Sequence, residues 1–362
     1  MTFVRRMDSL RVSWRSNSLT VAGSAFSDTL IGDNGVNVIT GGAGNDSIDG
    51  RAGVDVMTGG TGNDVYYVYD SGDVIVEADG EGARDRVLSK ADYTLAAGVS
   101  VEILGAVNQL QTTALNLTGN EFGQRISGNA GDNVLDGAGG DDDLTGIIGH
   151  DTLIGGTGND VYRVDTDDVI VETAGEGSDL VRAYTSYTLA AGVSIETMST
   201  KNSANTTAID LTGNELNQKM IANEGVNVLD GGGGNDRIQG LGGNDTLIGG
   251  DGADQLTGGT GNDIFRFNDA SESTGAARDI ILDFASGDSI DLANIDANSG
   301  AADDQAFTFI GTDAFSNIAG ELRYSIIDGN TLVYGDTDGD GNADLVIQLA
   351  GSHVMGGTDF GL

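Results

Sequence analysis

Aspartate recurs every nine residues in three stretches of this chain, and carboxylates at so regular a spacing can bind a hard cation. The residues in this phase are Asp28, Asp46, Asp55, Asp64, Asp142, Asp151, Asp160, Asp236, Asp245, Asp254 and Asp263. Asn37, Asn133 and Asn227 keep the same phase. Two positions after each lies a large apolar or aromatic residue, such as Ile48 or Tyr66. Every repeat therefore pairs a candidate metal ligand with a candidate core residue.

Glycines precede the aspartates in the pattern Gly-Gly-x-Gly-x-Asp, as in residues 41–46. Glycine adopts positive φ at little cost, so these six residues can form a tight turn that exposes carbonyl oxygens. Ca²⁺ binds six to eight oxygens and accepts carboxylates together with backbone carbonyls. We expect the following glycines to line the calcium sites: Gly42, Gly44, Gly60, Gly62, Gly156, Gly158, Gly232, Gly234, Gly243, Gly250, Gly252, Gly259 and Gly261.

Two nine-residue repeats make one coil of 18 residues, with a short strand on each side and a turn at each end. The predicted fold is all-β, a calcium-bound parallel β-roll (β-solenoid) with a C-terminal β-sandwich-like cap. Stacked coils bring together residues 18 positions apart, which gives the facing pairs Asp46–Asp64, Asp142–Asp160, Asp236–Asp254 and Asp245–Asp263. A flexible glycine-rich linker is the alternative, but a linker does not keep an apolar residue in phase.

The turns are not equivalent. Asn37, Asn133 and Asn227 lack the charge of aspartate, so their turns should bind calcium more weakly or lie at the ends of tracts. Gln124 and Gln218 hold the phase without a carboxylate, and the roll should begin there without metal. We therefore expect roughly four to eight calcium sites.

Composition limits the classes of partner. The 362 residues carry 17 Lys and Arg against 56 Asp and Glu, a formal charge of −39, which resists compaction and disfavours binding to nucleic acid or anionic membrane. The chain has no cysteine, so metal must take the place of disulfides. No apolar run approaches the length that membrane insertion needs. Near the N-terminus, Leu10, Val12 and Trp14 alternate with polar residues and predict a strand that covers the open end of the solenoid, with a frayed tail as the alternative.

A second repeat of about 94–96 residues overlies the first. Residues 93–100 recur at 187–194, and Asp73-Val-Ile-Val-Glu77 recurs at 168–172. The spacers carry strand signals and should form wider, largely metal-free coils of the same stack, with glycan binding on an exposed strand face as an alternative role. The predicted segments are an N-terminal strand or tail 1–22, tract one 23–68, spacer 69–122, tract two 123–165, spacer 166–216, tract three 217–268 and C-terminal domain 269–362.

The repeat resembles that of the RTX calcium-binding proteins. Residues 278–292 and 341–349 resemble the C-terminal domain that follows the repeats in serralysin-type secreted proteins, so that the resemblance covers residues 23–362. It implies export by a type I (ABC-transporter) machine, guided by an uncleaved C-terminal signal. The last residues, 357–362, are similar to the acidic-then-apolar end of such signals.

A further candidate calcium loop lies in the cap, formed by Asp336, Asp338, Asp340, Asn342 and Asp344. Carboxylates at loop positions 1, 3, 5 and 9, with glycine at position 6, match the EF-hand arrangement. The bidentate glutamate is missing, because position 12 is an isoleucine. A polar turn between two strands is the alternative.

Motifs for catalysis are missing from the sequence. His150 and His353 are the only histidines, and neither the zinc-protease motif His-Glu-x-x-His nor the hydrolase motif Gly-x-Ser-x-Gly occurs. Paired carboxylates could serve a glycosidase or an epimerase, but the repeat phase already explains them as calcium ligands. We expect no catalytic residues and no enzymatic activity.

These observations predict a secreted, extracellular protein that folds on calcium and serves as a structural component of the cell surface, in a surface layer, a matrix or adhesion. Self-assembly is one expected partner interaction and surface polysaccharide another. The alternative is a secreted polysaccharide-binding effector or an accessory part of an extracellular enzyme.

Overall fold

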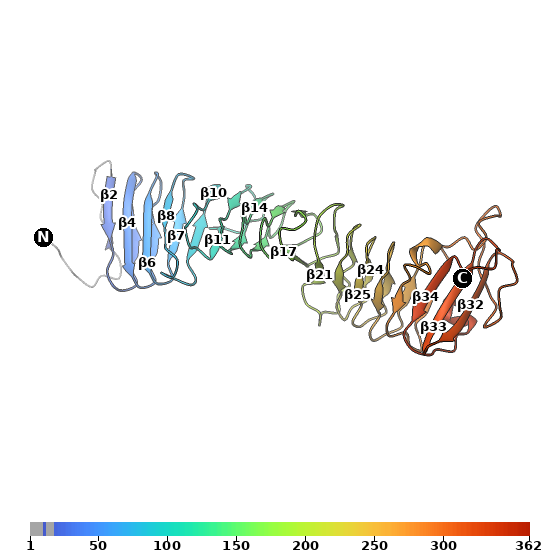
Figure 1. Ribbon diagram of the computed structural model, residues 1–362. Coiled ribbons are helices and arrows are strands. Elements are labelled where there is room, and N and C mark those ends of the chain that lie inside the picture. The colour runs from blue at the N-terminus through green and yellow to red at the C-terminus, as the bar shows by residue number, and fades with distance from the viewer. Residues whose placement is uncertain (1–9, 12–17) are drawn as a thin grey trace. The chain divides into compact units, whose positions relative to one another are not determined.

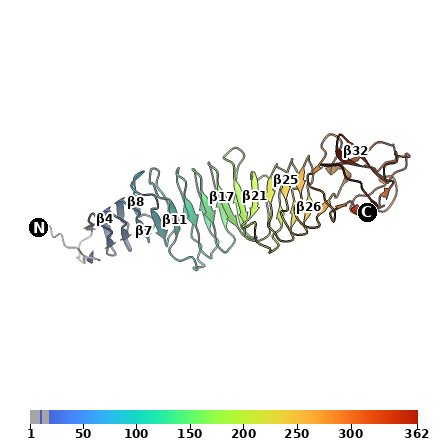
Figure 2. The ribbon, with the colours of Figure 1, turned by 90° about the horizontal axis from the view of Figure 1, so that it is seen from below.

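The computed structural model describes residues 10–11 and 18–362, which divide into two compact units, Met1–Asp179 and Leu180–Leu362. Each unit is a stack of coils whose strands form parallel sheets on opposite sides (Figures 1 and 2). The part of the chain so described contains no α-helix, and none of its helical segments is long and apolar enough to span a membrane. The all-β, parallel β-roll predicted from the sequence is confirmed.

In the first unit, every second strand joins one parallel sheet, and the strands between them form the opposite side. The first side consists of β1 (Leu10–Arg11), β3 (Thr29–Ile31), β5 (Ser47–Asp49), β7 (Val65–Val68), β9 (Arg86–Ser89), β11 (Ile103–Ala106), β13 (Arg125–Ser127), β15 (Asp143–Thr145) and β17 (Val161–Val164). The opposite side consists of β2 (Ser18–Ala22), β4 (Val36–Ala43), β6 (Val56–Thr61) and β8 (Val74–Val76), then β10 (Tyr93–Thr94), β12 (Leu117–Thr118), β14 (Val134–Asp136), β16 (Thr152–Ile154) and β18 (Val169–Val171). Of the predicted N-terminal strand, Val12 and Trp14 lie outside the described residues, while β1 pairs in parallel with β3.

The second unit repeats this arrangement. One side contains β19 (Leu180–Ala183), β21 (Thr197–Thr200), β23 (Lys219–Ile221), β25 (Arg237–Gln239), β27 (Gln255–Thr257) and β29 (Ile280–Ile281). The other contains β20 (Tyr187–Thr188), β22 (Leu211–Thr212), β24 (Val228–Asp230), β26 (Thr246–Ile248), β28 (Ile264–Arg266), β30 (Ser289–Asp291) and β35 (Phe360–Gly361).

The C-terminal cap is built onto these two sides. β31 (Thr308–Phe309) runs parallel to β32 (Glu321–Ile327), and β32, β33 (Asn330–Asp336) and β34 (Leu345–Leu349) form an antiparallel meander. β34 pairs in parallel with β29, and β35 pairs with β30. Two short 3₁₀ segments, η1 (Ala270–Glu272) and η2 (Gly357–Asp359), complete it. The cap thus extends the sheets of the roll and covers its last coil.

The core is a column of inward side chains, one from each short strand. The residue two positions after each repeat aspartate is fully buried, as for Ile48, Met57, Leu144 and Leu247. Its two neighbours on the strand face outward, as the alternation of a β-strand requires. Burying such a side chain contributes roughly 1.5–3 kcal/mol, so the stacked column stabilises the roll coil by coil.

The spacers form wider coils, as predicted. Within the tracts, paired residues lie 18 positions apart, as in Ile48↔Tyr66. In the first spacer the offset rises to 21 for Tyr66↔Val87 and to 24 for Tyr93↔Leu117. The added residues lie in turns, and the inward positions stay in register. The division into seven segments stays a prediction, because strands of the same kind run through tracts and spacers alike.

Candidate calcium sites

Each repeat aspartate is held in place by the preceding coil. The backbone N–H of Asp46 donates to Oδ1 of Asp64 at 2.6 Å, and the N–H of Asp142 donates to Oδ1 of Asp160 at 2.7 Å. The predicted pairs Asp236–Asp254 and Asp245–Asp263 show the same contact, at 2.7 Å and 2.9 Å. All four predicted pairs are therefore adjacent, and the carboxylates form ladders along the edges of the roll.

The second oxygen of these carboxylates has no hydrogen-bond partner. Among the described residues, an unpartnered buried Oδ2 is found at ten of the eleven repeat aspartates: Asp46, Asp55, Asp64, Asp142, Asp151, Asp160, Asp236, Asp245, Asp254 and Asp263. Each Oδ2 lies over the first glycine of its own turn, where a Cβ atom on Gly41 or Gly137 would overlap it. Burying an unpaired carboxylate oxygen is costly. A cation bound in each turn would remove this cost.

Burial and neighbouring carboxylates both act on the acidity of these groups. Burial raises the pKa of Asp142 to about 8 and that of Asp236 to about 7, against an ordinary value of 3.8. The carboxylate of the next coil, Asp160 or Asp254, raises these pKa values further, while the hydrogen bond from the preceding coil lowers them. Positive charge bound at the ladders would therefore favour the ionised form of these carboxylates.

The glycines predicted to line the sites have the backbone conformation that this role requires. All thirteen have positive φ, for example 114° at Gly42 and 108° at Gly44. Hard carboxylate and carbonyl oxygens are the ligands that Ca²⁺ prefers. The donor set thus fits calcium, while the assignment of individual carbonyls as ligands stays a prediction.

Where an amide residue replaces the aspartate, its side chain forms a hydrogen bond within its own turn. Nε2 of Gln124 donates to Oδ1 of Asn120, and Nε2 of Gln218 donates to Oδ1 of Asn214, both at 2.8 Å. Nδ2 of Asn133 likewise donates within its own turn, to Oδ1 of Asn129 at 3.1 Å. The amide oxygen lies over the first glycine of the turn, as Oδ2 of an aspartate does, and accepts a backbone N–H there, from Asn120 at Gln124 and from Asn129 at Asn133. This supports the expectation that these turns bind calcium weakly or not at all.

Converting one amide turn into a carboxylate turn tests this reading. We expect Asn133→Asp to lower the stability of the folded protein by about 1–3 kcal/mol at limiting calcium, because the variant turn then holds a buried acceptor that is unpaired. In calcium the same variant should bind one more ion than the wild type. The measurements are thermal unfolding at limiting and at saturating calcium, and a count of bound calcium by equilibrium dialysis.

The matched control is Asn108→Asp, which adds the same charge in an exposed turn where Oδ1 already accepts a backbone hydrogen bond. This control should change neither the thermal stability nor the number of calcium ions bound. An unchanged calcium count in Asn133→Asp would show that a carboxylate in this turn is not sufficient to create a site.

Asp28 differs from the other repeat aspartates. Its N–H donates to Oδ1 of Asp46, so it keeps its place in the ladder. Its Oδ2, however, accepts hydrogen bonds from the backbone N–H of Ser24 at 2.6 Å and from the Ser24 hydroxyl at 2.8 Å. The first turn is thus closed by serine, and Asp28 offers a weaker calcium site than the sequence predicted.

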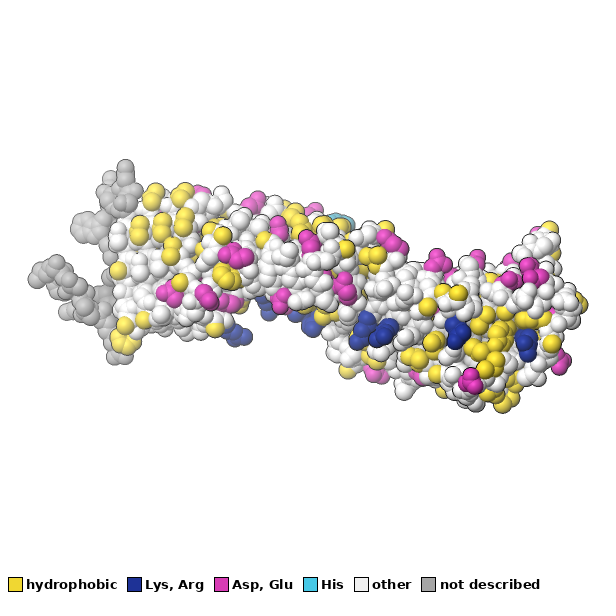
Figure 3. Space-filling view, viewed as in Figure 1, with side chains coloured by type: hydrophobic (Ala, Val, Ile, Leu, Met, Phe, Trp, Pro, Cys, Tyr) yellow, Lys and Arg dark blue, Asp and Glu magenta, His cyan; other side chains and the backbone are white. Residues whose placement is uncertain are grey.

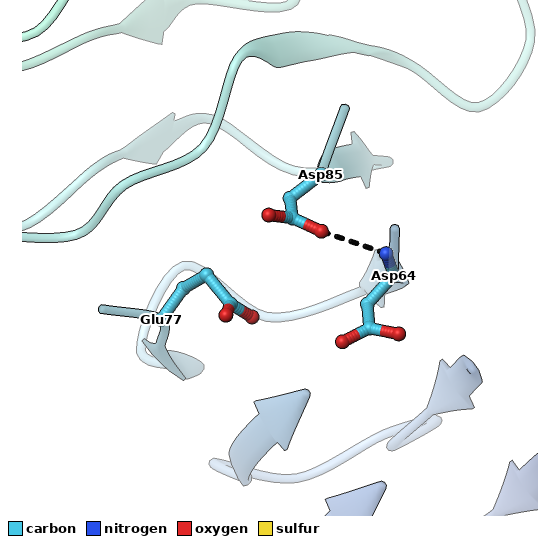
Figure 4. A group of neighbouring side chains, drawn as sticks. All are labelled: Asp64, Glu77 and Asp85. Carbon is cyan, nitrogen blue, oxygen red and sulfur yellow. Dashed lines mark hydrogen bonds between the residues drawn. The ribbon is translucent and has the colours of Figure 1, made fainter. Parts of the chain in front are cut away.

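The ladders continue into the regions that follow each tract, which the nine-residue pattern missed. Oδ1 of Asp85 accepts the N–H of Asp64 at 2.7 Å, and Oδ1 of Asp279 accepts the N–H of Asp254 at 2.9 Å. The offsets are 21 and 25 residues, so the phase of nine does not find them. One carboxylate oxygen each of Asp64, Asp85 and Glu77 gather in one group (Figure 4). The recurrence of the segment 73–77 at 168–172 was the only sequence signal for this group.

The acidic loop of the cap gathers three of its five predicted ligands. Carboxylate oxygens of Asp336, Asp338 and Asp340 lie within 4.8 Å of one another. The other two residues bond elsewhere: Oδ2 of Asp344 accepts the Thr337 N–H at 2.8 Å, and the Asn342 side chain donates to Asp340. Calcium binding at this loop stays a prediction.

Two protein families match parts of this chain. Residues 20–45, 31–66, 118–146 and 145–161 match the RTX calcium-binding nonapeptide repeat (4 copies), and residues 197–361 match the peptidase M10 serralysin C terminal family. Among solved structures, the chain is similar to the AlgE6R3 subunit of the Azotobacter vinelandii mannuronan C5-epimerase, with 24% identity over 44% of this chain and 79% of that chain and a TM-score of 0.27. It is also similar to the AlgE6R2 subunit, with 27% identity over 44% of this chain and 93% of that chain and a TM-score of 0.29.

No curated protein matches the sequence. The two family matches cover the repeats and the C-terminal region, and the nonapeptide repeats are calcium-binding. The chain thus contains RTX calcium-binding nonapeptide repeats and a serralysin-type C-terminal region, and calcium is its cofactor.

Proposed function

We propose that this protein is secreted and folds when its ladders bind extracellular calcium. The observation that carries the proposal is the set of buried carboxylate oxygens without a partner, which occur in both units. With a net charge of −39 and no disulfide, the chain has no other evident source of compensation for their repulsion. Calcium is scarce in the cytosol and abundant outside, so the same sequence stays unfolded before export and folds after it.

The free energy of calcium binding is large enough to decide whether the chain folds. At ten times its dissociation constant, a ligand that binds only the native state stabilises it by about 1.4 kcal/mol. About six such sites would contribute roughly 8 kcal/mol, which is comparable to the stability of a typical domain, about 5–15 kcal/mol. Since each coil contacts only its neighbours, binding in one turn favours order in the next.

Export by a type I (ABC-transporter) machine is part of this proposal, and it is supported by the serralysin-type C-terminal region. In the folded protein, the segment proposed as the export signal forms η2 and β35, and Phe360 is buried beside Phe309, with ring centroids 5.1 Å apart. Folding of the cap therefore buries the aromatic residue of this segment. Limited proteolysis tests the folding step: protein stripped of metal should be cut throughout, and calcium should protect residues 18–362. Equal resistance in both conditions would contradict it.

After folding, we propose a structural role at the cell surface, in a surface layer, a matrix or adhesion. Large apolar side chains stay exposed in the second unit, at Leu282, Ile326, Ile327 and Val354. Figure 3 shows apolar side chains gathered over the C-terminal strands, as expected of a contact surface. Light scattering and electron microscopy should show assemblies in calcium that disperse in chelator. A protein that stays monomeric in calcium at high concentration would contradict this role.

A second role, binding of an anionic surface polysaccharide, is favoured by a different observation. On the outward face of the second unit, Lys219 of β23 lies beside Arg237 of β25, and Gln255 of β27 follows in the same row. Both basic side chains are exposed in a chain that is otherwise strongly acidic. Saturable binding of an anionic glycan by monomeric protein, lost in Lys219→Glu, would favour this role over assembly. Binding that Lys219→Glu leaves unchanged would contradict it.

A further inference from the structure

A group of three buried carboxylates lies where the first tract passes into its spacer. It consists of Asp64, just before β7, Glu77, just after β8, and Asp85, just before β9. One oxygen of each lies within 4.8 Å of the others, and each side chain is at most 3% exposed. Figure 4 shows the Glu77 carboxylate directed toward the space between Asp64 and Asp85. Two of the three residues lie outside the nine-residue pattern.

Each of these carboxylates has one oxygen without a hydrogen-bond partner. Oδ1 of Asp64 accepts the N–H of Asp46, Oδ1 of Asp85 accepts the N–H of Asp64, and Oε2 of Glu77 accepts the Tyr66 hydroxyl. Oδ2 of Asp64, Oδ2 of Asp85 and Oε1 of Glu77 have no partner. The ion pairs of the described residues involve other carboxylates. Three buried carboxylates, each with one unpartnered oxygen, therefore lie together.

The other edge of the same tract shows how a ladder ends when no ion is needed. There the last carboxylate, Asp73, accepts the N–H of Asp55 through Oδ1 and the N–H groups of Tyr69 and Asp70 through Oδ2. Both of its oxygens are satisfied by backbone. The ladder through Asp85 continues, since the Asp85 N–H donates to Oε2 of Glu102 at 2.6 Å. Asp85 nevertheless keeps an oxygen without a partner and gains a further acid beside it, Glu77, which points to a bound cation.

The second tract of the same unit repeats the arrangement. Asp160, Glu172 and Asp179 form a buried group of the same kind, and the Tyr162 hydroxyl donates to Oε2 of Glu172. Oδ2 of Asp160 has no partner. Corresponding residues of the two groups are offset by 94–96 positions, the length of the long repeat. The tyrosine and all three acids therefore recur with the long repeat.

We propose that Asp64, Glu77 and Asp85 bind a calcium ion at the junction of tract and spacer, and that Asp160, Glu172 and Asp179 bind a second one. The donors are all oxygen, which favours Ca²⁺ over metals that prefer nitrogen or sulfur ligands. Each ion would join the last turn of a tract to the first wide coil of its spacer. The proposal rests on the calcium-dependent folding proposed above but assigns sites that the nine-residue pattern does not contain.

A count of bound calcium tests the two proposed sites. By equilibrium dialysis, Glu77→Gln should bind one calcium fewer than the wild type, and Glu77→Gln/Glu172→Gln two fewer. Asp79→Asn removes an exposed carboxylate two residues away and should bind as many as the wild type. Full calcium binding by the double variant would overturn the inference and leave calcium-dependent folding intact. Failure of the wild type to bind calcium would instead overturn the proposed function.

A second readout covers the case in which the glutamine variants do not fold. Tb³⁺ occupies calcium sites and emits when an adjacent tyrosine is excited, and Tyr66 and Tyr162 contact the two proposed sites through their glutamates. Tyr66→Phe keeps all three carboxylates and should lower the tyrosine-sensitised emission by about half, with an unchanged calcium count. Emission equal to that of the wild type would overturn the assignment at Glu77.

Discussion

Replacing Gly234 with alanine should destabilise the calcium-loaded roll by at least about 1–3 kcal/mol, the cost of holding an ordinary residue in a strained backbone conformation. Gly234 has φ of 96°, and a Cβ atom there would lie 2.6 Å from the carbonyl carbon of Leu216 in the preceding coil. The backbone of that coil cannot move without disturbing the ladder beside it, so we expect the loss to spread to neighbouring turns. Denaturant unfolding in saturating calcium measures the effect.

The adjacent residue supplies the matched control. Gly233 does not have positive φ, and a Cβ atom there would come no closer than 3.5 Å to its neighbours. Gly233→Ala should therefore be neutral or stabilise the protein by about 0.4–1 kcal/mol, since it restricts the unfolded chain. Equal effects of the two substitutions would contradict the turn geometry on which the calcium sites depend.

The second large effect is that of pH on the metal-free protein. We expect it to be most stable near pH 4 and to lose several kcal/mol as the pH rises toward 8, at about 1.4 kcal/mol for each unit by which a pKa is displaced. Burial raises the pKa of Asp142 and of Asp279 to about 8, far above the ordinary 3.8. Between these values the folded state binds more protons than the unfolded state, so stability falls with rising pH.

Calcium should reverse this dependence, because it binds the ionised carboxylates and competes with protons. Urea unfolding of metal-stripped protein, followed by circular dichroism from pH 4 up to the pH at which its β-structure is lost, measures the trend. Asp142→Asn removes one of the displaced groups, which Asp160, Asp136 and Asp141 surround, and should make the curve shallower. Metal-free stability that is constant or rises over this range would show that the buried carboxylates are compensated within the protein.

Much of the fold was predictable because the repeat fixes both the turn and the core. A coil of 18 residues with one inward side chain per strand follows from the spacing of Ile48 and Tyr66, and the observed register is Ile48↔Tyr66. The same coil length of 18 residues predicted which aspartates face each other. The pattern also predicted which turns bind calcium weakly, and the amides of Gln124 and Gln218 do form hydrogen bonds within those turns.

What the pattern missed depends on chain length in the turns and on local hydrogen bonds. Glu77 and Asp85 join the ladder of Asp64 only because the first wide coil is longer, and no period of nine reports that change. The closure of Asp28 by Ser24 depends on a hydroxyl four residues away. Which oxygen of an aspartate stays free is decided by the N–H of the preceding coil, a contact that exists only after the coils have stacked.

The central claim is that calcium, bound by the ladders, decides whether this chain folds. The most direct test is a calcium titration of metal-stripped protein at neutral pH, followed by far-ultraviolet circular dichroism. We predict little β-structure without calcium, and a steep, cooperative gain of it over a narrow range of calcium concentration. A chain that is already fully β-structured in strong chelator, with no change on adding calcium, would contradict the claim.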